Sequence, residues 1–377
     1  MSQSSKSPKP PAPAAASGPV VPPPLQPPPP PVPTSADVAR LAGVSRATVS
    51  YVLNNAEAVR ISEPTRRKVR EAAEELGYVP HAAARSLRAG HTRIVLLPTS
   101  HVPIGPLYST FLNELQWALR RLDYTVVQYG SLGLSGDEAA RAWAELRPVA
   151  VISLGEITLS AHNVATLKRA GARAVITMGP VSVPGAHALV MNQEEVGARA
   201  AAHLIERGRR RIGVVVPEED GLELFSGPRY AGARQAVGAL GAAGSGGSAG
   251  TAGSAAGRAA EIEALPMAYS EESAAALAAR WRGLGLDAVF AYNDEYAMLL
   301  MRALQDEGLR VPEDVAVIGA DDLLIGRLLR PRLSTVQIEL PTGEHLASLV
   351  DRAVREPSEV TQRHDLMAAA AVPREST

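Results

Sequence analysis

The 377-residue sequence contains no cysteine, which excludes disulfide bonds and thiolate metal sites. Its eight histidines do not follow the spacing of a metal site. No apolar run reaches the roughly 18 residues of a transmembrane helix, and the N-terminus lacks the charged start and apolar segment of a secretory signal. These absences favour a cytoplasmic protein, for which we expect no cofactor, no metal and no membrane partner.

Length and composition bound the number of folded units. With 377 residues and 46% hydrophobic content, the chain is too long for one ordinary domain and is apolar enough to bury a core, so two or three units are expected. The formal net charge of -1 says little about partners, because nucleic-acid binding depends on local charge.

Two segments have a composition that cannot supply a core. Residues 1–33 are rich in Pro, Ala and Ser, which favours a disordered, extended tail. This tail is either a spacer or a Pro-rich ligand for another domain, and we favour the spacer. Residues 241–258 are mostly Gly, Ala and Ser, and a G-x-G-x-x-A spacing occurs there. That spacing does not follow a strand, so we predict a flexible surface insertion rather than a phosphate loop.

Three short helical patterns follow the tail, within residues 34–80. The first begins at Thr34 with Asp37 three residues later, as in a capping box, and Gly43 ends it. Ser45 can cap the second helix, and Ser62 begins the third. We expect these helices to pack through apolar stripes at helical spacing, namely Val38, Leu41 and Ala42, then Val49, Val52 and Leu53, then Val69, Ala72, Ala73 and Leu76.

The stretch "SRATVSYVLN" carries small, hydroxylic and basic residues beside its apolar stripe. Such side chains suit base edges and methyl groups in a DNA major groove, and Arg46 can pair with guanine in a bidentate manner. A solvated surface helix would have a similar composition. The local charge favours DNA, because ten basic and six acidic residues between Thr34 and Arg93 leave a surplus of four.

From Thr92 onward, strand-like apolar runs alternate with amphipathic helices. Examples of these runs are "TRIVLLP", "VAVISLG", "RIGVVVP" and "DVAVIGA". Alternation of this kind is typical of parallel, doubly wound sheets covered by helices. About 280 residues with at least seven such runs predict two lobes rather than one sheet.

The residues now described resemble the lactose/galactose repressor (LacI/GalR) family. The resemblance is dense in "SADVARLAGVSRATVSYVLN", "LGYVP" and "AAARSLRAG", and it continues in "GRRRIGVVV", "FAYNDEYAMLLMRALQDEGLRVPEDVAVIGADD", "LSTV" and "REST". It implies a helix-turn-helix head over 34–80, a hinge helix over 81–91, and a two-lobed domain over 92–377 that resembles periplasmic binding proteins. That last domain would bind an effector and form the dimer.

The resemblance also implies which residues contact DNA. The second helix would read a major-groove half-site, and the hinge, which folds only on DNA, would wedge Leu87 into a central minor-groove step. Leu87 packed on the next domain is the alternative. The expected DNA-binding residues are Ser45, Arg46, Ala47, Thr48, Ser50, Tyr51, Asn54, Ala84, Leu87 and Arg88. His81 stands where the family usually has asparagine, which puts the junction of head and hinge in question.

The resemblance implies that Arg229, Asn293 and Asp321 bind a small effector between the lobes. A guanidinium, an amide and a carboxylate can together hold hydroxyls or an acidic group. Asn293 could instead cap the following helix, and Asp321 a turn. Two departures weaken the expectation of a sugar: "LPTSHVPIGPLYSTF" replaces a common family motif, and Met178 stands at a usual aspartate. The effector is therefore sugar-like or less polar, or has been lost.

We interpret the sequence as a DNA-binding transcription regulator, expected to be a repressor that binds an inverted-repeat operator as a homodimer. A solute-binding protein is the alternative, but it would have no use for the head. An enzyme would need a nucleophile with its base or a true cofactor loop, and we find neither.

Overall fold

The computed structural model describes residues 32–53, 60–81, 86, 90–99, 105–131, 133–154, 157–179, 182–244, 260–365 and 368–377. The chain forms two compact units, which divide after His81. Among the described residues, no helix is both long enough and apolar enough to span a bilayer.

The first unit contains three helices, α1 (Ser35–Ala42), α2 (Arg46–Leu53) and α3 (Glu63–Glu75). The predicted start of α1 is confirmed, because the Asp37 carboxylate accepts hydrogen bonds from the backbone N–H and the hydroxyl of Thr34, at 3.0 and 2.7 Å. Gly43 ends α1 with a φ of 66°, a left-handed conformation that favours glycine.

One predicted core position of this unit is wrong. Leu41 has 47% of its surface exposed, whereas Ala39, which was not in the predicted stripe, is buried. In an eight-residue helix that contacts both α2 and α3, the buried face is centred on Val38 and Ala39. Val49, Val52 and Val69 complete this small core as predicted.

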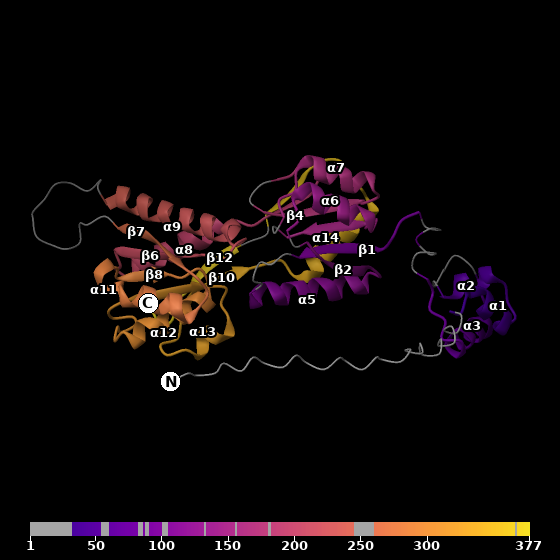
Figure 1. Cartoon of the computed structure of the whole chain (residues 1–377), viewed down its shortest axis with the longest axis horizontal. Coiled ribbons are helices and arrows are strands. Elements are labelled where there is room, and N and C mark those ends of the chain that lie inside the picture. The colour runs from indigo at the N-terminus through magenta and orange to yellow at the C-terminus, as the bar shows by residue number, and fades with distance from the viewer. Residues whose placement is uncertain are drawn as a thin grey trace, which may run out of the picture. The chain divides into compact units, whose positions relative to one another are not determined.

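The second unit consists of two lobes, each built on a six-stranded sheet (Figure 1). The N-lobe contains β1 (Ile94–Thr99), α5 (Pro106–Arg121), β2 (Thr125–Gly130), α6 (Gly136–Glu145), β3 (Ala150–Ser153), α7 (Ala161–Arg169), β4 (Ala174–Met178), β5 (His187–Val190), α14 (Gly343–Arg355) and β11 (Gln362–Asp365). The C-lobe contains α8 (Gln193–Glu206), β6 (Arg211–Pro217), α9 (Glu223–Gly244), β7 (Glu261–Met267), α10 (Glu271–Ala279), α11 (Trp281–Leu284), β8 (Ala288–Phe290), α12 (Asp294–Asp306), β9 (Ala316–Ala320), α13 (Leu324–Leu328), β10 (Ser334–Glu339) and β12 (Ala368–Val372).

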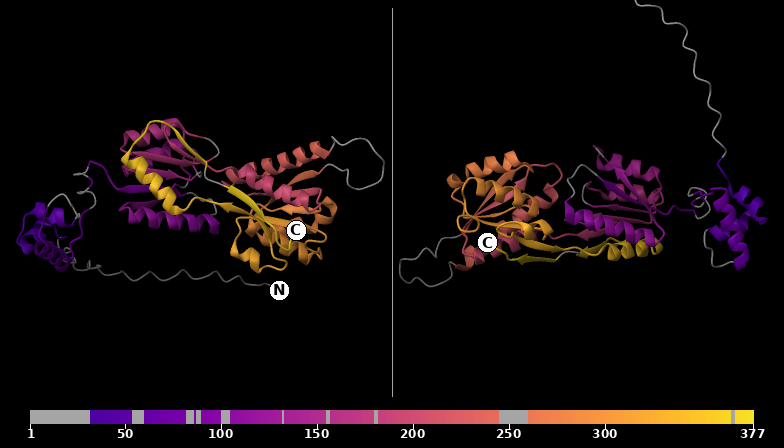
Figure 2. Two further views of the ribbon diagram at one scale, coloured as in Figure 1. Left: turned by 180° about the vertical axis from the view of Figure 1, so that it is seen from behind. Right: turned by 90° about the horizontal axis from the view of Figure 1, so that it is seen from below.

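Both sheets follow the same doubly wound order. The N-lobe order is β11-β5-β4-β3-β1-β2 and the C-lobe order is β12-β10-β9-β8-β6-β7, with β12 as the antiparallel strand. The chain passes between the lobes after β5, after β10 and after β11, so that the late helix α14 packs on α5 of the N-lobe (Figure 2). In sheets of this kind, ligands bind beyond the carboxyl ends of the strands, where the strand order reverses.

The alternation of strands and helices is as predicted, but five strands were not foreseen, namely β5, β7, β10, β11 and β12. Physical reasons are visible for three of them. β7 contains Pro266 and β11 is polar, features typical of strands at a sheet edge, which is where both lie. β12 reads "AAAAV", a composition that favours helix in isolation and becomes a strand here by pairing with β10.

The predicted insertion 241–258 begins too early, because α9 is helical to Gly244. The rest of that segment lies outside the described residues, as do the tail residues 1–31 and most of the predicted hinge.

Two glycines allow α8 and α9 to cross in close contact. A Cβ atom at Gly197 would lie 1.7 Å from the carbonyl oxygen of Arg229, and one at Gly232 would lie 1.9 Å from the carbonyl oxygen of Glu194. Neither position can carry a larger side chain unless the helices separate. The crossing therefore fixes the start of α9, and with it Arg229, against the start of α8.

We expect Gly232→Ala to destabilise the C-lobe by about 1 to 3 kcal/mol or more, because the added methyl group meets backbone rather than a movable side chain. Gly238→Ala is the matched control on the same helix. Its Cβ has no neighbour within 4 Å, so alanine should stabilise the helix by about 0.5 to 1 kcal/mol. Thermal unfolding of the two variants measures both effects, and similar melting temperatures for them would contradict the close crossing.

Candidate functional site

The outer face of α2 in the first unit carries the side chains predicted to contact DNA. Val49 and Val52 are 1% exposed and hold the helix against α1 and α3. On the remaining surface Ser45, Arg46, Ala47 and Tyr51 are exposed, while Thr48 and Ser50 are half-buried. The two valines thus orient the helix so that basic, hydroxylic and methyl groups face away from the core.

Ser45 caps α2, as predicted. Its Oγ accepts a hydrogen bond from the backbone N–H of Thr48 at 3.1 Å, and the two hydroxyls lie 2.9 Å apart. The capped helix start holds Arg46 and Ala47 in its first turn. The other predicted DNA-binding residues, Asn54, Ala84, Leu87 and Arg88, lie outside the described residues.

Within the second unit, the three predicted effector residues line one cleft of about 240 Å³. Asn293 follows β8, Asp321 follows β9, and Arg229 lies near the start of α9, the helix after β6. These strands are neighbours in the C-lobe sheet, so their carboxyl ends bring the three side chains together. The opposite wall of the cleft comes from the N-lobe and includes Leu107, Tyr108 and Leu154.

The guanidinium of Arg229 is buried and held on several sides. Its Nε donates to Gln193 Oε1 at 2.8 Å, and its Nη1 donates to the carbonyl oxygen of Tyr292 at 2.6 Å. Its Nη2 lies 3.8 Å from Asp321 Oδ1, and the group stacks 4.8 Å from the centre of the Tyr292 ring. These contacts offset the free energy that it costs to remove the guanidinium charge from water.

Asn293 caps a helix, as the alternative to effector binding anticipated, and it also lines the cleft. Its Oδ1 accepts a hydrogen bond from the backbone N–H of Tyr296 at 3.0 Å, at the start of α12. Asp321 has a positive φ of 97°, and its backbone N–H donates to Val336 at 2.9 Å. Burial raises the pKa of Asp321, and the Arg229 charge opposes that rise.

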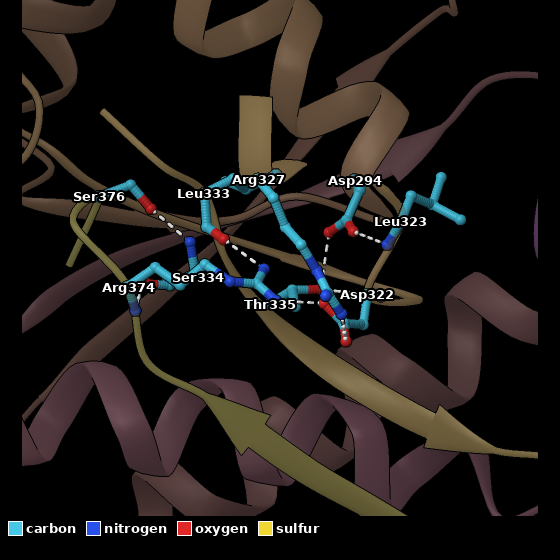
Figure 3. A network of polar contacts seen from close by, with 9 residues as sticks. All are labelled: Asp294, Asp322, Leu323, Arg327, Leu333, Ser334, Thr335, Arg374 and Ser376. Atoms are coloured by element: carbon cyan, nitrogen blue, oxygen red, sulfur yellow. Dashed lines mark hydrogen bonds and ion pairs between the residues drawn. The ribbon is translucent and has the colours of Figure 1, made fainter. Parts of the chain in front are cut away.

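A buried polar network holds the loop that carries Asp321 (Figure 3). Asp294 accepts hydrogen bonds from the Leu323 backbone N–H at 2.7 Å and from the Thr335 hydroxyl at 2.6 Å. Asp322, the residue after Asp321, pairs with Arg374 near the C-terminus and with Arg327 on α13.

The C-terminal residues tie this network to the sheet. Arg374 Nη1 donates to the carbonyl oxygen of Leu333 at 2.7 Å. The Ser376 hydroxyl accepts from Ser334 N–H and donates to the Val317 carbonyl, at 2.7 and 2.6 Å. The final turn of chain therefore supports the loop behind the cleft.

Met178, which departs from the family pattern, is buried at the end of β4 and lines a neighbouring cavity of about 420 Å³ rather than the cleft itself. Of the other departing stretch, residues 100–104 lie outside the described residues. The part that is described contributes Gly105, Leu107 and Tyr108 to the cleft wall.

The sequence did not indicate most of the residues that line the cleft, among them Gln193, Tyr292 and Glu295. Tyr292 and Glu295 flank Asn293 just after β8, so their closeness to Asn293 in the sequence could have indicated that they line the cleft. Gln193 lies just past a crossing between the lobes, and only the folded structure brings it to Arg229.

Two protein families match this chain. Residues 34–81 match the family described as bacterial regulatory proteins, lacI family, and residues 201–377 match the periplasmic binding protein-like domain. The HTH-type transcriptional regulator CelR of Thermobifida fusca is 33% identical over 342 residues, which cover 87% of this chain and 94% of that protein. The chain belongs to the lacI family.

Other members of the lacI family agree with this assignment. The HTH-type transcriptional repressor PurR of Vibrio atlanticus (strain LGP32) is 31% identical over 307 residues, covering 80% of this chain and 86% of that protein. The lacI-family members named here are transcription regulators, and so is this chain; it is not an enzyme.

Solved structures of the family share the fold. A complex of the transcriptional regulator CelR with cellobiose has a TM-score of 0.60 and 26% identity, and the match covers 92% of this chain and all (100%) of that one. The lac repressor dimer bound to operator and the anti-inducer ONPF has a TM-score of 0.72 and 21% identity, covering 91% and 98% of the two chains. At that lower identity the likeness concerns the fold alone.

A buried carboxyl beside the cleft gives a prediction about stability and pH. Burial raises the pKa of Asp294 from 3.8 to about 7, against the opposing effect of its two hydrogen-bond donors. The folded protein therefore keeps a proton that the unfolded chain loses, and the free energy of unfolding should fall as pH rises between these two pKa values. Within that interval, this carboxyl lowers the free energy of unfolding by up to about 1.4 kcal/mol for each unit of pH.

We expect Asp294→Asn to flatten this pH dependence, because the amide does not titrate. Urea unfolding at several pH values between about 4 and 7, the interval between the two pKa values, measures the slope. Asp306→Asn, at the exposed end of α12, is the control and should leave the slope as it is. A slope that Asp294→Asn does not change would contradict this assignment.

Proposed function

We propose that this lacI-family regulator is a repressor that binds an inverted-repeat operator as a homodimer and responds to a small molecule held between its lobes. The observation that carries the proposal is the first unit, in which two buried valines turn the exposed residues of a capped α2 outward. Helix-turn-helix proteins place such a helix in the major groove, and dimers bind two half-sites about one helical turn apart.

In this proposal the head covers residues 34–80, and α2 reads the bases. Arg46 lies in the first turn of α2, where its guanidinium can pair with guanine O6 and N7. Ala47 and the methyl group of Thr48 suit thymine methyl groups. Exposed basic residues elsewhere in the unit, among them Arg60, Arg67 and Lys68, supply charge for phosphates.

The proposed hinge, residues 81–91, would join the two heads at the centre of the operator. There Ala84 would lie against the minor groove, and Leu87 would enter a base step beside Arg88. Unstacking a step costs a few kcal/mol, which wider contact with the bent DNA offsets.

We propose that Arg229, Asn293 and Asp321 bind a sugar-like or less polar effector in the cleft. The shared cleft and the cellobiose bound by the related CelR support this proposal. The effector would control DNA binding only if it binds the DNA-competent and incompetent states with different affinity.

Exposed apolar side chains on the second unit support the homodimer. On α13, Leu324 is 71% exposed and Leu328 is 63% exposed, and Ile325 lies between them. On the N-lobe, Trp117 of α5 is 68% exposed. Exposed apolar side chains that gather on one short helix, as on α13, are typical of a protein contact.

We expect Arg46→Ala to weaken binding to a selected genomic operator by about 1 to 3 kcal/mol, with little change on random DNA, if Arg46 pairs with a base. Genome-wide mapping of bound fragments supplies the operator, and fluorescence anisotropy at fixed salt measures both affinities. Arg67→Ala removes the same charge from α3 and should affect the two DNAs alike. Equal losses for Arg46→Ala on both DNAs would exclude base reading by this residue.

We expect Leu328→Arg to shift the protein from dimer to monomer, because a charge is then buried where an apolar contact is proposed. Sedimentation velocity over a range of concentrations measures the change. Val360→Arg is the matched control, since Val360 is 71% exposed but lies between α14 and β11 in the N-lobe. A Leu328→Arg protein that remains dimeric would remove α13 from the dimer contact.

A further inference from the structure

The cleft offers carboxylate acceptors, and several of its donors already have protein partners. All three nitrogens of Arg229 face acceptors of the protein, on Gln193, Tyr292 and Asp321. The side chains of Asn293 and Tyr269 form hydrogen bonds with the Glu295 carboxylate. A carboxylate has about four acceptor sites, so a ligand that enters this cleft meets carboxylate oxygens that can accept further hydrogen bonds.

The charges around the cleft are unbalanced. Asp321 and Glu295 line it, and Glu219 lies directly behind its tyrosines, where it accepts hydrogen bonds from the Tyr296 hydroxyl and the Tyr269 N–H. Against these three carboxylates stands one guanidinium, that of Arg229. With all four groups ionised, one positive and three negative charges sum to -2.

Three tyrosine side chains that line the same cleft, Tyr269, Tyr292 and Tyr296, lie close to one another. The ring centre of Tyr296 lies 5.3 Å from that of Tyr269 and 5.5 Å from that of Tyr292. Arg229 already lies over Tyr292, at 4.8 Å. Aromatic faces beside carboxylates are typical of sites that bind organic cations.

Glu295 extends across the cleft toward the other lobe. Its Oε2 lies 3.6 Å from the position that a Cβ would take at Gly105, the residue before α5 in the N-lobe. The start of a helix contributes about half a positive charge, which is less than one carboxylate carries. Glu295 therefore stands between the two lobes with its charge incompletely balanced.

From these contacts we propose that the effector carries a positively charged amine, which Asp321 and Glu295 bind against the faces of Tyr269 and Tyr296. The rest of the molecule lies on the apolar N-lobe wall of Leu107, Leu154 and Met191. An ammonium group supplies both the charge and the donors that this wall requires. This inference rests on the cleft being the effector site, as proposed above, and it adds a cationic amine to the sugar-like or less polar molecule proposed there.

The titration of the cleft carboxyls agrees with the geometry. Burial raises the pKa of Glu295, and the nearby charge of Asp321 raises it further. A bound cation would favour the ionised form of both groups. Binding of the amine should therefore release protons, and it should weaken as the pH falls and these carboxyls become protonated.

The test uses the purified full chain and pairs of molecules that differ only in the amine. Suitable pairs are glucosamine with glucose, choline with dimethylbutanol, and tyramine with ethylphenol. Isothermal titration calorimetry at neutral pH should show at least one amine binding about tenfold tighter than its neutral partner, equivalent to about 1.4 kcal/mol. That preference should shrink as the pH is lowered.

Variants identify the group responsible. Glu295→Gln should abolish the preference for the amine, whereas Glu263→Gln, an exposed control on β7, should leave it unchanged. If Glu295→Gln does not fold, the pH dependence of the unmodified protein decides. Equal binding within every pair, tighter binding of the neutral molecules, or no binding of any amine would overturn the inference.

Failure of this inference and failure of the proposed function give different results. If a neutral molecule binds the cleft and releases the selected operator, the regulator is confirmed and the amine is overturned. If the unmodified protein does not prefer any genomic fragment, the proposed function fails whatever the cleft binds.

Discussion

The structure of the C-lobe around the cleft depends on the buried guanidinium of Arg229. A buried charge is tolerated only when hydrogen bonds and an opposite charge replace water, and Arg229 obtains these from three separate segments of chain. The contact is available because Gly197 and Gly232 let α8 and α9 approach closely enough to bring Gln193 beside it. Close helix crossing, charge compensation and the shape of the cleft are thus parts of one arrangement.

In the C-lobe, residues that line the cleft are followed directly in the sequence by residues that contact the segment around α13. Asn293 lines the cleft, and the next residue, Asp294, holds the backbone of Leu323, which immediately precedes α13 with its exposed leucines. Asp321 and Asp322 repeat this pattern, one facing the cleft and the other paired with Arg327 on α13. Two adjacent pairs of residues thus connect the cleft lining directly to the α13 surface.

Much of the fold could be predicted from the sequence because its signals are local. Helix caps such as Thr34 and Ser45, and strands buried on both faces, are encoded by neighbouring residues. Leu41 was misplaced because, in a short helix with two partners, the buried face depends on tertiary packing. The edge strands were missed for a related reason, since β12 becomes a strand only through its pairing with β10.

The candidate site could be predicted in part through the resemblance to the lacI family. That resemblance indicated Arg229, Asn293 and Asp321, and the structure brings them to one cleft. Gln193 and Glu219 could not be found, because their contacts join segments far apart in sequence. The excess of negative charge emerges only when these segments are assembled.

The three passages of the chain between the lobes have a consequence for biosynthesis. The N-lobe sheet ends with β11 at Asp365, and its helix α14 also comes from the last part of the chain. The C-lobe also depends on the last residues, because the Ser376 hydroxyl forms hydrogen bonds with Ser334 and Val317. During translation the head can fold as soon as it leaves the ribosome, but neither lobe can be completed until almost the whole polypeptide has been made. A ribosome that stalls or stops early would thus release a folded head without a controlling domain.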